Sequence, residues 1–252
     1  MRKLMLLTAL FSPLVLADSL SVAPHSVLRL ASKASVVHLE RLEVAEAASL
    51  VLPASLVELK IDQLTLGRDA RISVVSAEET LRIEVARAQL AEGSLISATG
   101  AAGNYERAAR PGRSLDLRLR QVQAPLLSID ARGGAGAPGY VGLDGANGKA
   151  GGCTWGSASR GANGDDGGNG HDGAAGGRVH LVVPADYPAE QIKVRLEGGA
   201  PGVAGAAGKA GQGGASKGCL VYRTEAGANG RPGAAGQPGM AGAAGELSVQ
   251  RL

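Results

Sequence analysis

Four aromatic and basic side chains, gathered in two short stretches of this chain, are the residues best suited to binding. Aromatic rings beside arginine are typical of binding surfaces, where the rings stack on sugars or enter receptor pockets. The simpler interpretation is that these side chains close one end of the fold as a small plug. The ligand-binding candidates are Trp155, Arg160, Tyr222 and Arg223.

The only two cysteines, Cys153 and Cys219, lie in the same two stretches. Two lone cysteines with no histidine beside them do not make a zinc site, so we expect no metal there. An even pair in an exported protein predicts a disulfide. A bridge between two copies of the chain is the alternative.

A cluster of carboxylates and amides offers calcium chemistry. The run Gly167-Gly-Asn-Gly-His-Asp172 matches the start of a calcium-binding nonapeptide repeat, but it occurs once and lacks the apolar residue that should follow. We therefore expect a solvated polar face, with no metal and no cofactor. The cluster consists of Asn163, Asp165, Asp166, Asn169 and Asp172.

Catalytic patterns are missing from the sequence. The four histidines are scattered, and there is no H-E-x-x-H, G-x-S-x-G or C-x-x-C motif. No G-K-[ST] follows the glycines, which excludes a phosphate loop. We expect no catalytic residue and no enzyme, with a glycosidase-like carboxylate pair as the minor alternative.

The first 17 residues predict export. Arg2 and Lys3 precede an apolar stretch, and Val15-Leu16-Ala17 resembles a cleavage site before Asp18. Removing residues 1–17 lowers the net charge from +3 to +1, because two of the 26 basic residues leave with them. The mature chain is then expected in the periplasm, on the outer surface or outside the cell. It has no transmembrane segment and no charge excess for nucleic acid.

Glycine dominates the second half of the chain. There are 39 glycines in 252 residues, while aromatic residues make up 2%. Twenty-six of the glycines recur at every third position, in runs over 133–151, 161–176, 199–214 and 227–245. Period three matches the polyproline II helix, and the bare ridge of glycines lets another backbone approach closely. The matched run lengths favour two hairpins of extended helices.

Triplets such as Gly-Ala-Pro, Gly-Ala-Asn, Gly-Arg-Pro and Gly-Gln-Pro resemble those of bacterial collagen-like secreted proteins, over 133–245. The pattern also resembles the glycine-rich bundles of some phage tail-fibre tips and of a glycine-rich antifreeze protein. These resemblances imply either packed helices within one chain or a triple helix between chains. A flexible linker is the remaining alternative.

Alternating apolar residues in units of 20–22 residues predict strand–turn–strand repeats before and between the runs. We expect an all-β fold, with a β-solenoid-like stem and Gly-X-Y polyproline II hairpins packed as a bundle; the alternative is a β-sandwich with collagen-like triple-helical segments. The expected divisions are a signal peptide (1–17), a β-repeat stem (18–132), a first hairpin (133–177), a strand pair continuing the stem (178–198), a second hairpin (199–245) and a closing strand (246–252).

These observations favour an exported, non-enzymatic structural or adhesive protein. Its disulfide-locked glycine bundle would contact a cell-surface receptor or a glycan, and self-association is a further expectation. A trimeric collagen-like fibre or matrix component is the first alternative. An ice- or surface-binding module, suggested by flat faces of small residues, is the second.

Overall fold

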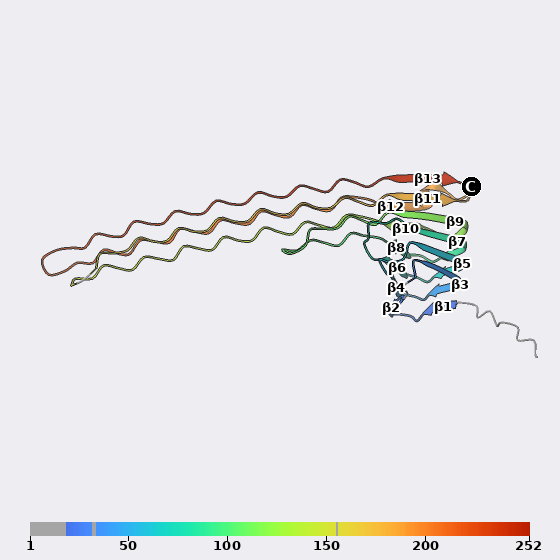
Figure 1. Cartoon of the computed structure of the whole chain (residues 1–252), viewed down its shortest axis with the longest axis horizontal. Coiled ribbons are helices and arrows are strands. Elements are labelled where there is room, and N and C mark those ends of the chain that lie inside the picture. Colours follow the sequence, from blue (N-terminus) through green and yellow to red (C-terminus); the bar gives the residue numbers. More distant parts are fainter. Residues whose placement is uncertain (1–18, 32–33, 155) are drawn as a thin grey trace, which may run out of the picture.

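The computed structural model describes residues 19–31, 34–154 and 156–252, so the leader predicted at 1–17 lies outside the described residues. The described chain has a body of short strands and a much longer, glycine-rich arm that projects from one edge of it (Figure 1). The C-terminus lies at the opposite end of the strands from the arm. In the described part of the chain, no helix is long and apolar enough to cross a membrane.

The strands form two sheets in which every pairing between named strands is parallel. In spatial order, the seven-stranded sheet contains β1 (Ser19–Val22), β3 (Val36–Val44), β5 (Glu58–Leu66), β7 (Leu81–Leu90), β9 (Leu115–Gln123), β11 (Val179–Val183) and β13 (Leu247–Arg251). The six-stranded sheet contains β12 (Ile192–Arg195), β10 (Leu127–Asp130), β8 (Leu95–Ser97), β6 (Arg71–Val74), β4 (Ser49–Leu52) and β2 (Val27–Arg29). Consecutive strands alternate between the sheets, so each sheet grows by one strand per repeat.

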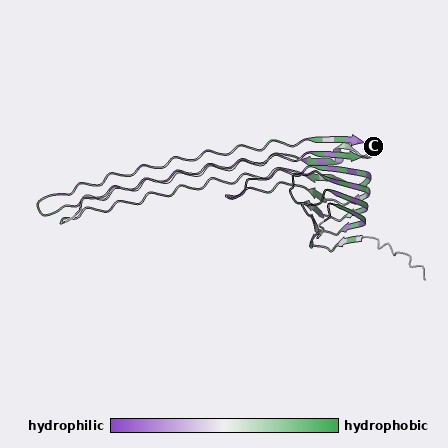
Figure 2. Ribbon diagram, viewed as in Figure 1, coloured by the Kyte–Doolittle hydropathy of each residue, from purple (hydrophilic) through white to green (hydrophobic). Residues whose placement is uncertain are grey.

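Alternation of side chains along the strands produces the core. Leu59, Ile83, Leu117 and Leu181 lie in register on neighbouring strands, and each is at most 1% exposed. Figure 2 shows hydrophobic and hydrophilic residues alternating along the same ribbons. Branched aliphatic residues pack well on such a surface, which explains how a body with so few aromatic residues has a dry interior.

In the first four repeats, a tight turn connects the strand of the seven-stranded sheet to the strand of the six-stranded sheet that follows it. His25, Ala47, Asp69 and Gly93 occupy equivalent positions in four successive turns, and each has a φ between 53° and 75°. This left-handed conformation is strained for most residues but is repeated from turn to turn, because the amide of one turn donates to the carbonyl of the next. The N–H of Ala47, for example, donates to the carbonyl of Arg68 at 2.8 Å.

The fold class expected from the sequence is wrong. The body consists of two parallel sheets, an arrangement otherwise typical of α/β proteins. It is nearly without helix, since the described residues contain a single 3₁₀ turn (Ala189–Gln191). The alternative, a β-sandwich with collagen-like triple-helical segments, is wrong as well, because such a sandwich is built from antiparallel strands. Apolar alternation specifies which face of a strand is buried, but it carries no information on pairing direction.

A polyproline II bundle is not shown either. The glycine-rich residues have no regular secondary structure, and what the structure gives for them is a set of extended segments joined by lateral hydrogen bonds. We call the stretches 133–151, 161–176, 199–214 and 227–245 arm segments 1 to 4. Glycine at every third position specifies a close backbone approach, which is a weaker constraint than a particular helix type.

All the excursions leave the body at the same corner. The loop 98–114, the chain from 131 to 178 and the chain from 196 to 246 each follow a strand of the six-stranded sheet and return to a strand of the seven-stranded sheet. Because those strands are neighbours in their sheets, the excursions lie side by side from the start (Figure 1). The body therefore sets the spacing of the arm segments.

Glycine amides hold the arm together. Those of segment 1 donate to segment 3, and those of segment 2 donate to segment 4; Gly139 to Val203 at 2.8 Å and Gly170 to Gln237 at 2.8 Å are examples. Glycines of segment 3 donate to segment 2, and glycines of segment 4 donate to segment 3. Segment 2 also donates to segment 1, as in the bond from Gly168 to Tyr140 at 2.8 Å. Segments 2 and 3 thus form the middle of the arm, and each bonds with the three other segments.

Candidate functional site

The two stretches that carry the predicted site meet at the far end of the arm (Figure 1). We call residues 152–160 and 215–226 together the tip. The first stretch connects segments 1 and 2, and the second connects segments 3 and 4. The predicted disulfide is confirmed: Cys153 and Cys219 are bonded within the chain across a sequence separation of 66, with their Cα atoms 5.7 Å apart.

The second stretch of the tip forms a small hairpin. The N–H of Thr224 donates to the carbonyl of Lys217 at 2.9 Å, and the N–H of Lys217 donates back to the Thr224 hydroxyl at 2.9 Å. The N–H of Cys219 donates to the carbonyl of Tyr222 at 2.8 Å, and Gly218 and Arg223 form an antiparallel bridge. These bonds leave Leu220 and Val221 at the turn.

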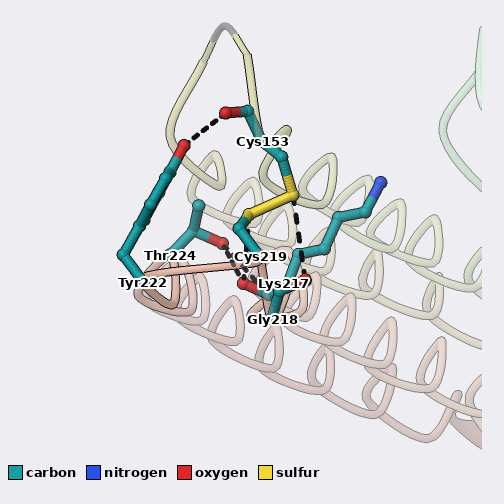
Figure 3. The surroundings of a disulfide bond; sticks show 6 residues. All are labelled: Cys153, Lys217, Gly218, Cys219, Tyr222 and Thr224. Carbon is teal, nitrogen blue, oxygen red and sulfur yellow. Dashed lines mark hydrogen bonds between the residues drawn. A yellow bond between two sulfur atoms is a disulfide. The ribbon is translucent and has the colours of Figure 1, made fainter.

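Tyr222 joins the hairpin to the other stretch. Its hydroxyl donates to the backbone carbonyl of Cys153, so a hydrogen bond and the disulfide link the two stretches at neighbouring points (Figure 3). The side chain remains half exposed. Tyr222 can therefore brace the tip and still present one side of its ring to a ligand.

The other predicted candidates have different outcomes. Arg160 and Arg223 are both exposed in the tip. Trp155 lies outside the described residues, so its prediction concerns the sequence alone. The three cations of the tip, Arg160, Lys217 and Arg223, outnumber its one acid, Glu225, which gives this small region a net charge of +2 by subtraction.

Two residues of the tip were not chosen from the sequence. Leu220 is 105% exposed relative to a reference residue and Val221 is 92% exposed. They are the most exposed large apolar side chains of the described chain. The sequence signal for them was an apolar pair in a stretch where the three-residue glycine repeat is interrupted. It gave no indication of exposure, because apolar residues in a loop are often buried beneath it.

The predicted polar cluster has a structural use. The Oδ1 atoms of four of its members accept backbone N–H groups of segment 4 at 2.6–2.9 Å: Asn163 from Arg231, Asp166 from Ala234, Asn169 from Gln237 and Asp172 from Met240. Asp144 and Asn147 do the same for Lys209 and Gln212 of segment 3. We call these six residues the Asx ladder. In the described residues, no group of three or more His, Cys, Asp or Glu is arranged to hold a metal ion.

A shallow groove on the outer face of the seven-stranded sheet is the main competitor as a site. Its charged residues include Lys60, Glu84 and Arg118. Lys60 lies 2.9 Å from Glu58, and Arg118 lies 3.2 Å from Asp116. Burial alone would raise the pKa of Asp116, but hydrogen bonds from Arg118 and Arg82 hold that pKa below its ordinary value. Charges that neutralise one another in this way favour a solvated sheet face over a ligand site.

The histidines stay apart. His38 contacts Asp62 at 3.3 Å on the outer face of the sheet, while His171 lies on the arm and His25 in a turn.

No family model matches the chain, and neither a curated protein nor a solved structure matches it. The fold and the geometry of the tip are therefore the basis for any functional argument.

Proposed function

We propose that this is an exported, non-enzymatic adhesive or structural protein whose disulfide-locked tip contacts a surface or receptor. The observation that carries the proposal is the position of the tip. Exposed apolar, aromatic and cationic side chains are fixed by a disulfide at the far end of a long arm (Figures 1 and 3). Segment 1 has 19 residues, which allows the arm to extend up to about 65 Å from the body.

Rigidity supports this role. Each arm segment is hydrogen-bonded along its length to its neighbours, and the body anchors the arm through strands of both sheets. A rigid presentation reduces the entropy lost on binding, since the contacting side chains are already ordered. Export is part of the proposal, and the disulfide is what an oxidising compartment allows.

The hydrogen bonds favour a single-chain arm over the trimeric fibre. In a triple helix, glycine amides donate to other chains, whereas here they donate to segments of the same chain. Sedimentation of the purified protein should accordingly give a monomer. A trimer that melts cooperatively would contradict this part of the proposal.

The binding role is tested with labelled protein on intact bacterial cells and on a printed glycan array. The variant carries Trp155→Ala and Tyr222→Ala, and its fold is checked by circular dichroism and by the presence of the disulfide. We expect the folded variant to lose binding to whichever probe the wild-type protein binds. Unchanged binding by the folded variant would sink the assignment of the tip, and absence of binding to both probes by the wild-type protein would argue against an adhesive role.

A further inference from the structure

The apex of the tip hairpin has an unusual composition for its position. Hairpin turns favour Gly, Asn and Asp, which adopt tight backbone conformations and are well solvated. Here Leu220 and Val221 occupy the turn, with almost no contact to the rest of the chain (105% and 92% exposed). Two adjacent aliphatic side chains on a convex point cannot form a pocket, but they can enter one or enter a lipid layer.

The supports beneath the apex are already formed. Cys219, directly before Leu220, is held by the disulfide. Tyr222, directly after Val221, donates its hydroxyl to the carbonyl of Cys153 (Figure 3). The apolar pair is thus held outward from both sides. Exposure of two apolar side chains to water is unfavourable, so the position of Leu220 and Val221 is best explained by a partner that buries them.

Cations belong to the same tip as the apolar apex. Lys217 and Arg223 lie on opposite legs of the hairpin, and Arg160 belongs to the stretch joined to it by the disulfide. Glu225 is the single acid of the tip. An apolar point with an aromatic residue and cations behind it has the layering of a lipid interface, where acyl chains, interfacial aromatic rings and anionic headgroups follow one another with depth.

We propose that the tip inserts Leu220 and Val221 into the interface of an anionic lipid surface. Tyr222 then lies at headgroup level, and Lys217, Arg223 and Arg160 bind the lipid phosphates. This inference rests on the proposed function, of which it names the target. A protein receptor with an apolar pocket is the competing partner; the convex apex, which offers side chains without a surrounding complementary surface, favours the lipid.

Vesicle co-sedimentation tests the inference with the whole protein. The probes are vesicles of phosphatidylcholine alone and of phosphatidylcholine mixed equally with phosphatidylglycerol. The wild-type protein should bind the anionic vesicles, and binding should weaken as salt rises, because exposed charges are screened. Each phosphate-binding cation contributes about a fivefold gain in affinity, so neutral vesicles should bind at least tenfold more weakly.

The decisive variant combines Leu220→Ser with Val221→Ser, and it should lose more than about tenfold in affinity for anionic vesicles, since most of the buried apolar area is removed. Its matched control combines Leu143→Ser with Val203→Ser, which changes two exposed apolar residues (72% and 67% exposed) on the side of the arm. The control should bind like the wild-type protein. Both variants are checked for the disulfide and for the melting temperature.

Three results would overturn the inference: no binding of the wild-type protein to anionic vesicles, equal binding to neutral vesicles, or equal losses in the tip and arm variants. None of them touches the proposed function, which fails separately if the tip variant Trp155→Ala/Tyr222→Ala still binds cells or glycans. Binding to cells that depends on the tip but is accompanied by no vesicle binding would identify a protein or glycan receptor instead.

Discussion

Single residues with buried charge hold the corner from which the arm leaves the body. Arg113 is completely buried just before β9, and its guanidinium donates to the backbone carbonyls of Leu56, Val75 and Glu79. Burial lowers the pKa of this guanidinium. Leu56 lies in the passage from β4 to β5, whereas Val75 and Glu79 both lie in the passage from β6 to β7. Because Arg113 itself lies in the passage from β8 to β9, its side chain ties three successive repeats together.

Replacing Arg113 with Met should destabilise the body strongly. Arg113→Met keeps an apolar stem of similar length but leaves buried carbonyls without donors, which costs about 3 kcal/mol or more in the free energy of unfolding. Urea unfolding followed by circular dichroism measures this loss. Arg29→Met, on the exposed side of β2, is the matched control and should change little. Equal effects of the two substitutions would refute a special role for Arg113.

Asp130, at the end of β10, is the second buried charge, and it pairs with the partly exposed Arg132. The Arg132 Nη2 atom lies 2.8 Å from Oδ2 of Asp130, and its Nε lies 3.0 Å from Oδ1. Burial alone would raise the pKa of Asp130, but these hydrogen bonds and that from the Arg132 N–H hold it below the ordinary value of 3.8. A carboxylate with a lowered pKa stabilises the fold above the pKa of the unfolded state.

The stabilisation by Asp130 is therefore present at neutral pH and is lost as the pH falls below about 4. We expect Asp130→Asn to lower the free energy of unfolding at pH 7 by on the order of 1 kcal/mol. The difference from the wild-type protein should shrink steadily on acidification below pH 4. Urea titrations over this range measure it, with the exposed Asp186→Asn as control. A difference independent of pH would show that lost shape, and not lost charge, causes the effect.

At the scale of elements, the arm is built from backbone approach and from the Asx ladder. A Cβ atom on Gly205 would lie 1.9 Å from the carbonyl oxygen of Tyr140. Because that oxygen belongs to the backbone, no side-chain rotation can relieve the clash. In the hairpin of the tip, by contrast, a Cβ atom on Gly218 would have no heavy atom within 4 Å. The two glycines thus differ in what they do, although both lie in the glycine-rich region.

This difference predicts opposite results for two identical changes. Gly205→Ala should force segments 1 and 3 apart and raise the exchange rate of the amides that bond them, such as that of Gly139 to Val203. Gly218→Ala should leave the same amides protected, because nothing opposes the added methyl group. Hydrogen–deuterium exchange read by mass spectrometry compares the two. Equal protection in both variants would contradict the packing of the arm.

The sequence predicted these elements unevenly. The period of the glycines located the arm segments, because that period is local in the chain. The bond between Cys153 and Cys219 was predicted because they are the only pair of cysteines in a chain expected to be exported. The parallel pairing of the strands depends on contacts between repeats, and alternation along a strand such as β5 is the same for either direction. The Asx ladder was not predicted, because Asp165 and Asp166 are the same residue type side by side in the sequence. Only Asp166, in the third position of its Gly-X-Y triplet, accepts an N–H group of segment 4.

At the scale of the whole molecule, loss of the disulfide should loosen the tip and leave the body unchanged. Replacing both cysteines with Ser, or reducing the bond, releases a closure across 66 residues. The loop-entropy model gives at most about 4 kcal/mol for this closure. We expect faster amide exchange in 215–226 and unchanged protection in β5 and β7, measured on the reduced and the oxidised protein. Equal exchange in the tip under both conditions would show that the hydrogen bonds alone keep it closed.

The central claim is that the protein meets its target with the tip and with no other surface. Its most direct test is photocrosslinking to intact cells with p-benzoyl-phenylalanine placed at a single position, in place of Leu220 at the tip, Val203 on the side of the arm or Leu247 on the edge strand β13. All three side chains are exposed, so the probe is accessible at each position. We expect covalent adducts from position 220 alone. Adducts from position 203 or 247, or none from position 220, would contradict the central claim.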